Sequence, residues 1–91
     1  MKNYERVLKA LANRRRLAIL RYLQKEKEAR VSDIAGVIKL SFKATSRHLL
    51  QLAAVDILEK EQRSIEVFYR IAKNLTPPIK SVLTYIPNSS E

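Results

Sequence analysis

The sequence predicts a mainly α-helical fold with one β-hairpin, in a single domain covering residues 1–91. Two observations carry this prediction. Apolar residues recur at helical spacing through residue 54 and again after a proline pair at 77–78. Between these regions, residues 57–71 change to the alternation of a half-buried strand. The expected order is therefore four helices, two strands and a last helix.

Two helices are expected at the start of the chain. The first spans residues 3–12, and the second runs from residue 14 to about residue 24 with Asn13 as its N-cap. Residues 25–28 form a charged connector. Val31 is expected in a short strand or an extended link.

The next two helices form a helix-turn-helix. Ser32 is expected to cap a short third helix, with Asp33 in its first turn and its end near Lys39. Ser41 is expected to cap a longer fourth helix over residues 42–54. In such a motif the second helix of the pair usually lies in the DNA major groove.

A β-hairpin is expected after the helix-turn-helix and would form the wing of a winged helix-turn-helix. Its strands are expected at residues 57–62 and 65–71, with a tight turn at residues 63–64. The proline pair then begins a last short helix, because proline is tolerated in a first helical turn. Residues 87–91 are expected to form a loose tail.

Composition restricts the function. Lys and Arg total 18 against nine acidic residues, and the net charge of +9 favours a polyanionic partner such as nucleic acid or a membrane surface. Cysteine is absent, and the chain has one histidine and one glycine, so we expect no metal site, no cofactor and no catalytic site. The chain also lacks a membrane-length apolar run and a secretory signal, which predicts a cytoplasmic protein without membrane contact.

The fourth helix has two contrasting faces. A helical wheel groups Thr45, Leu49 and Leu52 toward the core, with Phe42 and Ala53 close by. Exposed Lys, Arg and Gln side chains suit DNA, although any solvated helix face can carry them. The residues expected to read bases, or to lie close to them, are Lys43, Arg47, Gln51, Ala44, Ser46 and His48. The residues expected to contact phosphate are Ser41, Lys39, Arg14, Arg15, Arg16 and Arg63.

Several strings in this order resemble the ArsR family of winged-helix repressors. They are Lys9 to Leu20 (KALANRRRLAIL), Val31 to Ala35 (VSDIA), Thr45 to Leu49 (TSRHL) and Val67 to Ile71 (VFYRI). The resemblance implies a homodimer that joins through its first and last helices and binds a palindromic operator. The apolar residues available for that contact are Tyr4, Val7, Leu8, Ile79, Val82, Leu83 and Ile86, unless all of them pack within one monomer.

The chain departs from that family pattern at its sensing positions. Arg30 and Ser32 stand where many members carry a metal-binding Cys-x-Cys, and residues 79–86 contain neither histidine nor carboxylate. Metal sensing at those sites is therefore not expected. Lys39 and Asp56 replace glycines that are usual in the turn and before the wing.

Three functions remain open from the sequence. The first is a homodimeric, sequence-specific DNA-binding regulator, with repression implied by the resemblance. The second is a protein–protein assembly module, suggested by the acidic residues Glu59, Glu61 and Glu66 in the wing. The third is a non-specific nucleic-acid binder that acts through charge alone. The same acidic residues make the wing a weaker DNA contact than the fourth helix, or a purely structural element.

Overall fold

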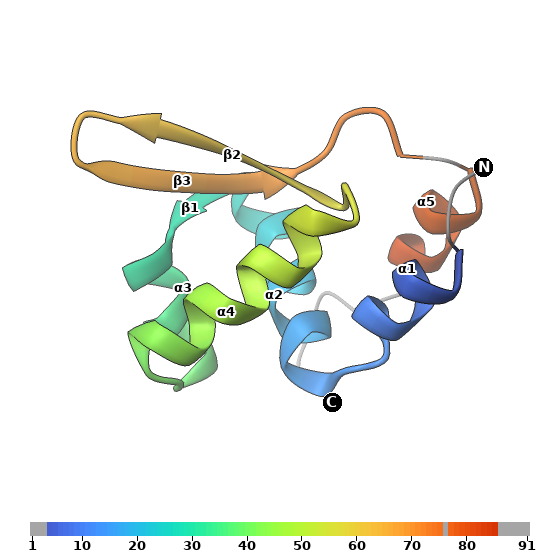
Figure 1. The fold of residues 1–91 in the computed structure, drawn as a ribbon, viewed down its shortest axis with the longest axis horizontal. Coiled ribbons are helices and arrows are strands. Elements are labelled where there is room, and N and C mark those ends of the chain that lie inside the picture. Colours follow the sequence, from blue (N-terminus) through green and yellow to red (C-terminus); the bar gives the residue numbers. More distant parts are fainter. Residues whose placement is uncertain (1–3, 76, 86–91) are drawn as a thin grey trace.

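The computed structural model describes residues 4–75 and 77–85. The elements are α1 (Tyr4–Leu11), α2 (Arg14–Glu26), β1 (Glu28–Arg30), α3 (Val31–Ile38), α4 (Phe42–Ala54), β2 (Leu58–Arg63), β3 (Glu66–Ile71) and α5 (Pro77–Thr84). A small sheet lies along one side of the helices, and α1 and α5 occupy the end away from the hairpin tip (Figure 1). The fold is a winged helix-turn-helix, as predicted.

One hydrophobic core joins the helices to the sheet. The side chains with less than 2% exposure are Ile19, Leu20, Ile34, Leu49, Leu52, Ile57 and Thr45, and Leu23 is 2% exposed. They come mainly from α2, α3 and α4, so these three helices fix one another around a shared apolar centre. Tyr69 of β3, at 3% exposure, closes the core on the sheet side.

Both predicted side-chain caps at the starts of α2 and α4 are confirmed. The Asn13 side chain accepts hydrogen bonds from the backbone N–H groups of Arg15 and Arg16, at 2.9 and 3.0 Å. Ser41 Oγ accepts one from the N–H of Ala44, at 3.1 Å. Each cap satisfies backbone donors that have no partner inside the helix.

The predicted cap of α3 is wrong. Ser32 lies inside the helix and is exposed, and the extended residue before the helix is Arg30. The Arg30 N–H donates to Asp33 Oδ2 at 3.2 Å, and the Arg30 guanidinium pairs with the same carboxylate at 3.1 Å. Asp33 therefore stabilises this helix start, in the first turn where an anion is favoured.

The sheet has a third strand, β1, just before Val31, where a short strand or an extended link was expected; Val31 itself begins α3. The strand order is β1-β3-β2, and both pairs are antiparallel. The three residues of β1 fall at the end of the predicted charged connector and pair with β3, so that Ala29 lies opposite Tyr69. The hairpin turn is Ser64-Ile65, one residue later than predicted, and Ser64 adopts a left-handed φ of 58°.

The apolar residues expected at a dimer contact divide into two groups. Val7, Ile79 and Leu83 are 8%, 5% and 4% exposed and belong to the core of this chain. Tyr4, Leu8 and Val82 are 43%, 57% and 36% exposed and stay on the surface. Ile86 and the predicted tail at residues 87–91 lie outside the described residues. Only the second group is therefore open to a partner subunit.

Two adjacent leucines of α4 test this account of the core. Leu49→Ala should lower the free energy of unfolding by about 2–5 kcal/mol, because it removes a fully buried side chain and leaves a cavity. Leu50→Ala is the matched control, since Leu50 is 47% exposed and its truncation should cost well under half as much. Urea unfolding followed by circular dichroism measures both values. Equal losses would contradict the assigned helix faces.

Candidate nucleic-acid interface

The turn between α3 and α4 positions the exposed face of α4. Lys39 ends α3 in the left-handed conformation, with φ 57° and ψ 50°, where the family pattern has glycine. The N–H of Leu40 donates to the carbonyl of Ala35 at 3.1 Å and closes the turn. The capped start of α4 follows directly, so Lys39 and Ser41 lie beside the first turn of that helix.

The predicted faces of α4 are confirmed, with one correction. Thr45, Leu49 and Leu52 are buried. The exposed residues are Phe42, Lys43, Arg47, Leu50, Gln51 and Ala54, and Ala44, Ser46 and His48 are half-buried. The correction is Phe42, which was placed near the core face but is 61% exposed. It is the first residue of α4 and lines a groove toward the hairpin, shared with Leu50 and Ile65.

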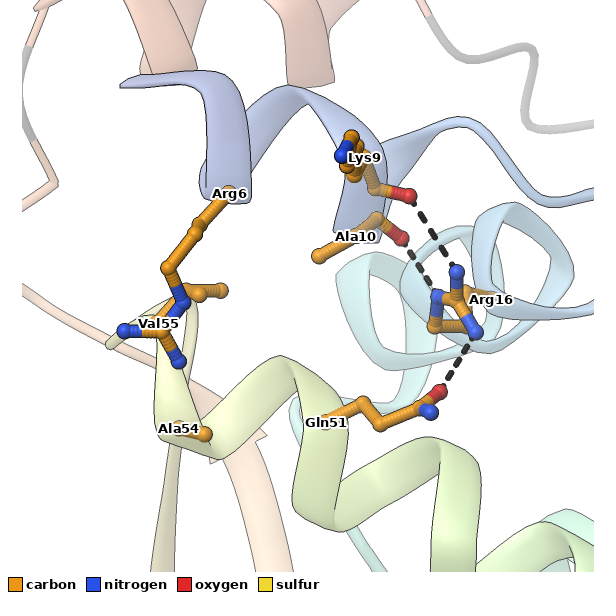
Figure 2. A pocket seen from close by; sticks show the side chains of 7 residues that line it. All are labelled: Arg6, Lys9, Ala10, Arg16, Gln51, Ala54 and Val55. Atoms are coloured by element: carbon orange, nitrogen blue, oxygen red, sulfur yellow. Dashed lines mark hydrogen bonds between the residues drawn. The ribbon is translucent and has the colours of Figure 1, made fainter. Parts of the chain in front are cut away.

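Arg16 holds three helices together, although the sequence assigned it to phosphate. Its guanidinium donates to the carbonyls of Ala10 and Lys9 in the last turn of α1, the second at 3.2 Å. It also donates to Gln51 Oε1 of α4, and its Nη1 lies 3.1 Å from His48 Nδ1. Figure 2 shows the side chain reaching from α2 between α1 and α4. Arg16 is thus engaged by protein acceptors on both sides.

This network also changes what Gln51 and His48 can do. The Gln51 carbonyl oxygen is already bonded to Arg16, as Figure 2 shows, so its amide is held toward α1. His48 accepts from Arg16 in its neutral form. Burial lowers the pKa of His48 below its ordinary 6.5, the charges of Arg16, Arg15 and Arg47 lower it further, and an interaction with Gln51 opposes them. Fewer polar side chains of α4 are therefore free of intramolecular partners than the sequence predicted.

The arginines of the sheet are paired with carboxylates on its outer face. Arg63, predicted to contact phosphate, bonds Glu28 at 2.7 and 2.8 Å and Glu61 at 3.1 Å, and its guanidinium lies 4.4 Å from the Phe68 ring centroid. Arg70 bonds Glu59 and Glu61 at 3.2 and 3.0 Å, and Arg30 bonds Glu66 at 2.8 Å. The hydrogen bond from Arg63 lowers the pKa of Glu28, and those from Arg63 and Arg70 lower the pKa of Glu61.

The remaining cations among the predicted contacts are exposed and unpaired. Within residues 4–75 and 77–85, no ion pair or side-chain hydrogen bond involves Lys39, Lys43, Arg47, Arg14 or Arg15. Arg15 and Arg47 both act on the pKa of His48, so their charges lie near the middle of α4. The sequence prediction did not single out Arg21 and Lys25, which follow Arg14 at helical spacing on α2 and line a groove with it. Their helical spacing from Arg14 was the sequence signal that could have identified them.

The described part of the chain lacks both a metal-ligating cluster and a membrane-length helix. No group of three or more His, Cys, Asp or Glu residues there could hold a metal ion. At one position where the family pattern has a metal-binding cysteine, Arg30 is instead paired with Asp33 and Glu66. No helix in the described residues is long and apolar enough to cross a membrane.

The fold and the exposed basic helix define a winged helix-turn-helix protein of the DNA-binding type. The model for "Bacterial regulatory protein, arsR family" matches residues 13–60, which is more than half of the chain. The chain therefore belongs to the ArsR family of DNA-binding transcriptional regulators. No curated protein sequence matches the chain.

Several solved structures resemble the chain over most of its length. HlyU from Vibrio cholerae N16961 is 30% identical, with a TM-score of 0.76 over 89% of this chain and 84% of that one. The homodimeric winged helix-turn-helix domain of Mb0332 from Mycobacterium bovis is 31% identical, with a TM-score of 0.76 over 89% and 71%. The transcriptional repressor PagR of Bacillus anthracis is 26% identical, with a TM-score of 0.72 over 88% and 87%.

Removing the Arg16 side chain should destabilise the fold. Arg16→Ala is expected to lower the free energy of unfolding by about 1–3 kcal/mol, because it leaves the part-buried Ala10 carbonyl of α1 and His48 of α4 without their charged donor. Arg15→Ala removes the same charge from an exposed neighbour and should change stability by no more than about 0.5 kcal/mol. Urea unfolding distinguishes the two variants, and equal small effects would refute the structural role of Arg16.

The lowered pKa of His48 predicts a pH dependence of stability. The folded chain binds this proton more weakly than the unfolded chain, so the contribution of neutral His48 is complete above about pH 6.5 and is lost as the pH falls below it. The free energy of unfolding at pH 5.5 should therefore be lower than at pH 7.5. His48→Gln keeps an acceptor for Arg16 without a titrating group and should flatten this difference. An unchanged pH profile in that variant would assign the dependence to other groups.

Proposed function

We propose that the chain is a homodimeric transcriptional repressor that binds a palindromic operator with α4 in the major groove. The observation that carries this proposal is that Lys43 and Arg47 are both exposed and that neither has an ion-pair partner among the described residues. They lie one turn apart on a helix that Leu49 and Leu52 anchor in the core. Arg and Lys both bind guanine edges, with Arg able to bind bidentately. Lys39, Ser41, Arg14 and Arg15 surround this face and supply the proposed phosphate contacts, and Ala44 and Ser46 lie beside it.

The dimer is proposed to join through α1 and α5. Tyr4, Leu8, Val82 and Tyr85 are exposed there, and large exposed apolar side chains gathered on neighbouring elements mark interaction surfaces. Tyr4 and Val7 of α1 line a small cavity together with Ile79 of α5, so the two helices are neighbours. The Mb0332 domain, which has the same fold and is homodimeric, supports a dimer. Two-fold symmetry of the protein would be matched by a palindromic operator.

Repression in the cytoplasm is the proposed role. PagR, which is similar over 88% of this chain, is a transcriptional repressor. A bound dimer that covers a promoter needs no further chemistry to block transcription, and the described residues offer no group of metal-ligating side chains. The chromosome that such a protein binds lies in the bacterial cytoplasm.

Fluorescence anisotropy with labelled duplexes tests this proposal. The probes are the DNA upstream of the protein's own gene and a scrambled duplex of equal length, at about 0.15 M salt, where non-specific binding is weak. A preference of about a thousandfold supports a specific, self-regulating repressor. Equal and salt-sensitive binding to every genomic upstream fragment tested would instead show a non-specific binder, and no binding would refute the DNA role.

The paired and unpaired arginines should behave differently in this assay. Arg47→Ala should weaken operator binding by about 5–150-fold and relax the preference at particular base pairs, as expected for loss of one base contact of about 1–3 kcal/mol. Arg63→Ala should change neither the affinity nor its salt dependence, because Glu28 and Glu61 already neutralise Arg63. A large loss in the Arg63 variant would show that the wing exchanges its carboxylates for phosphate.

A protein-assembly role is the second candidate function. The groove between α4 and the hairpin, of about 450 Å³, is lined by three exposed apolar residues, Phe42, Leu50 and Ile65. The outer face of the sheet carries little net charge because its arginines are paired. A protein partner would use these surfaces and leave Lys43 and Arg47 unused, so binding that survives Arg47→Ala but is lost in Ile65→Ser would favour this role.

A further inference from the structure

A second basic surface lies in the groove between α2 and α3. The groove has a volume of about 490 Å³ and is lined by Arg14, Arg15, Ala18, Arg21, Tyr22, Lys25, Val37 and Ile38. Four of these residues are cationic, and none is a carboxylate. Its size falls within the range of small-molecule sites, about 300–1,000 Å³.

The four cations of this groove occupy positions where their charges destabilise α2. Arg14 and Arg15 occupy the first turn of α2, where the helix dipole disfavours positive charge. Arg21 and Lys25 are four residues apart on the same helix, which makes them a repulsive pair. In the described part of the chain none of the four has an ion pair or a side-chain hydrogen bond, whereas the arginines of the sheet are all paired. An anion in the groove would relieve this repulsion.

The groove also offers apolar surface and one hydroxyl group. Val37 is 52% exposed on α3, and Ile38 and Ala18 lie beside it, half-buried. Burial raises the pKa of Tyr22, and Glu26 and Asp33 raise it further, so its hydroxyl stays protonated and can donate a hydrogen bond. A duplex backbone would neutralise the cations but would cover Val37 with charged phosphate. A ligand with both an anionic group and an apolar body fits the whole lining.

We propose that this groove binds a small amphipathic carboxylate that regulates DNA binding. The carboxylate pairs with the arginines, its apolar body covers Val37 and Ile38, and Tyr22 donates to the anionic end. The regulatory part rests on the proposed function, since Arg14 and Arg15 are also proposed phosphate contacts. Occupancy neutralises these two residues and occupies one side of α3, the first helix of the DNA-binding pair. The ligand therefore weakens operator binding.

Calorimetric titration of the whole chain without DNA tests the site. The probe is 2-naphthoate, with acetate and neutral 2-naphthamide as comparison ligands. Binding of naphthoate well above both comparisons is expected. The double variant Arg21→Ala, Lys25→Ala should weaken it at least about tenfold, and Val37→Ser should weaken it without a change in charge. The matched control is Lys73→Ala, Lys80→Ala, which removes two exposed cations outside the groove.

Each alternative outcome overturns a stated part of the proposal. If naphthoate does not bind at millimolar concentration, the groove is not a ligand site. If the groove variant and the control variant lose equal affinity, the binding is general charge attraction. Acetate binding as tightly as naphthoate removes the apolar component. A loss of duplex binding in the Arg21, Lys25 variant equal to its loss of naphthoate binding makes the groove a DNA contact. If operator affinity is unchanged at saturating naphthoate, the groove binds the ligand but does not regulate DNA binding. Circular dichroism verifies that every variant folds.

Discussion

The hydrogen bonds of one guanidinium tie α4 to α1 beside the apolar core that α2, α3 and α4 share. Arg16 sits between the last turn of α1 and the middle of α4, and it donates to acceptors on both helices. A planar guanidinium with several fixed donors can satisfy such divergent acceptors, which a lysine could not. Because α1 is proposed to carry part of the dimer contact, the same side chain links that contact to the helix proposed to enter DNA.

The charge of the chain is divided between two regions with different roles. On the outer face of the sheet, Arg30, Arg63 and Arg70 are bonded to carboxylates, which removes them from contact with a polyanion. On α2 and α4 no cation has a carboxylate partner among the described residues, and all of them except the half-buried Arg16 and Arg21 are exposed. The excess of +9 is therefore concentrated on the helical side. We therefore expect the wing to stabilise the fold and to contribute little to the electrostatic attraction of DNA.

The sequence predicted the elements well and the partners of charged residues poorly. Periodicity located α1, α2, α4 and the hairpin within a few residues, since core packing imposes that pattern. It left β1 open as a short strand or an extended link at Val31, because three residues carry no usable period and the strand Glu28–Arg30 is recognised by its pairing with β3. The phosphate contacts of Arg16 and Arg63 stay predictions, but their intramolecular partners could not be foreseen, because sequence shows that a cation is present and not that Gln51 or Glu28 lies opposite it in space. Phe42 was misplaced because a wheel ignores where the core ends along the helix axis.

The shortened free face of α4 has a consequence for how DNA would be read. Gln51 is engaged by Arg16 and His48 is half-buried, so the free polar side chains lie in the first turns of the helix, at Lys43 and Arg47. In helix-turn-helix proteins the N-terminal residues of the recognition helix are the ones that contact base edges. The intramolecular bonds of Arg16 thus anchor the C-terminal half of α4 to the protein and leave its N-terminal half free for a duplex. Specificity from one such helix rests on few contacts, which makes a second, symmetry-related helix in a dimer the physical route to tight operator binding.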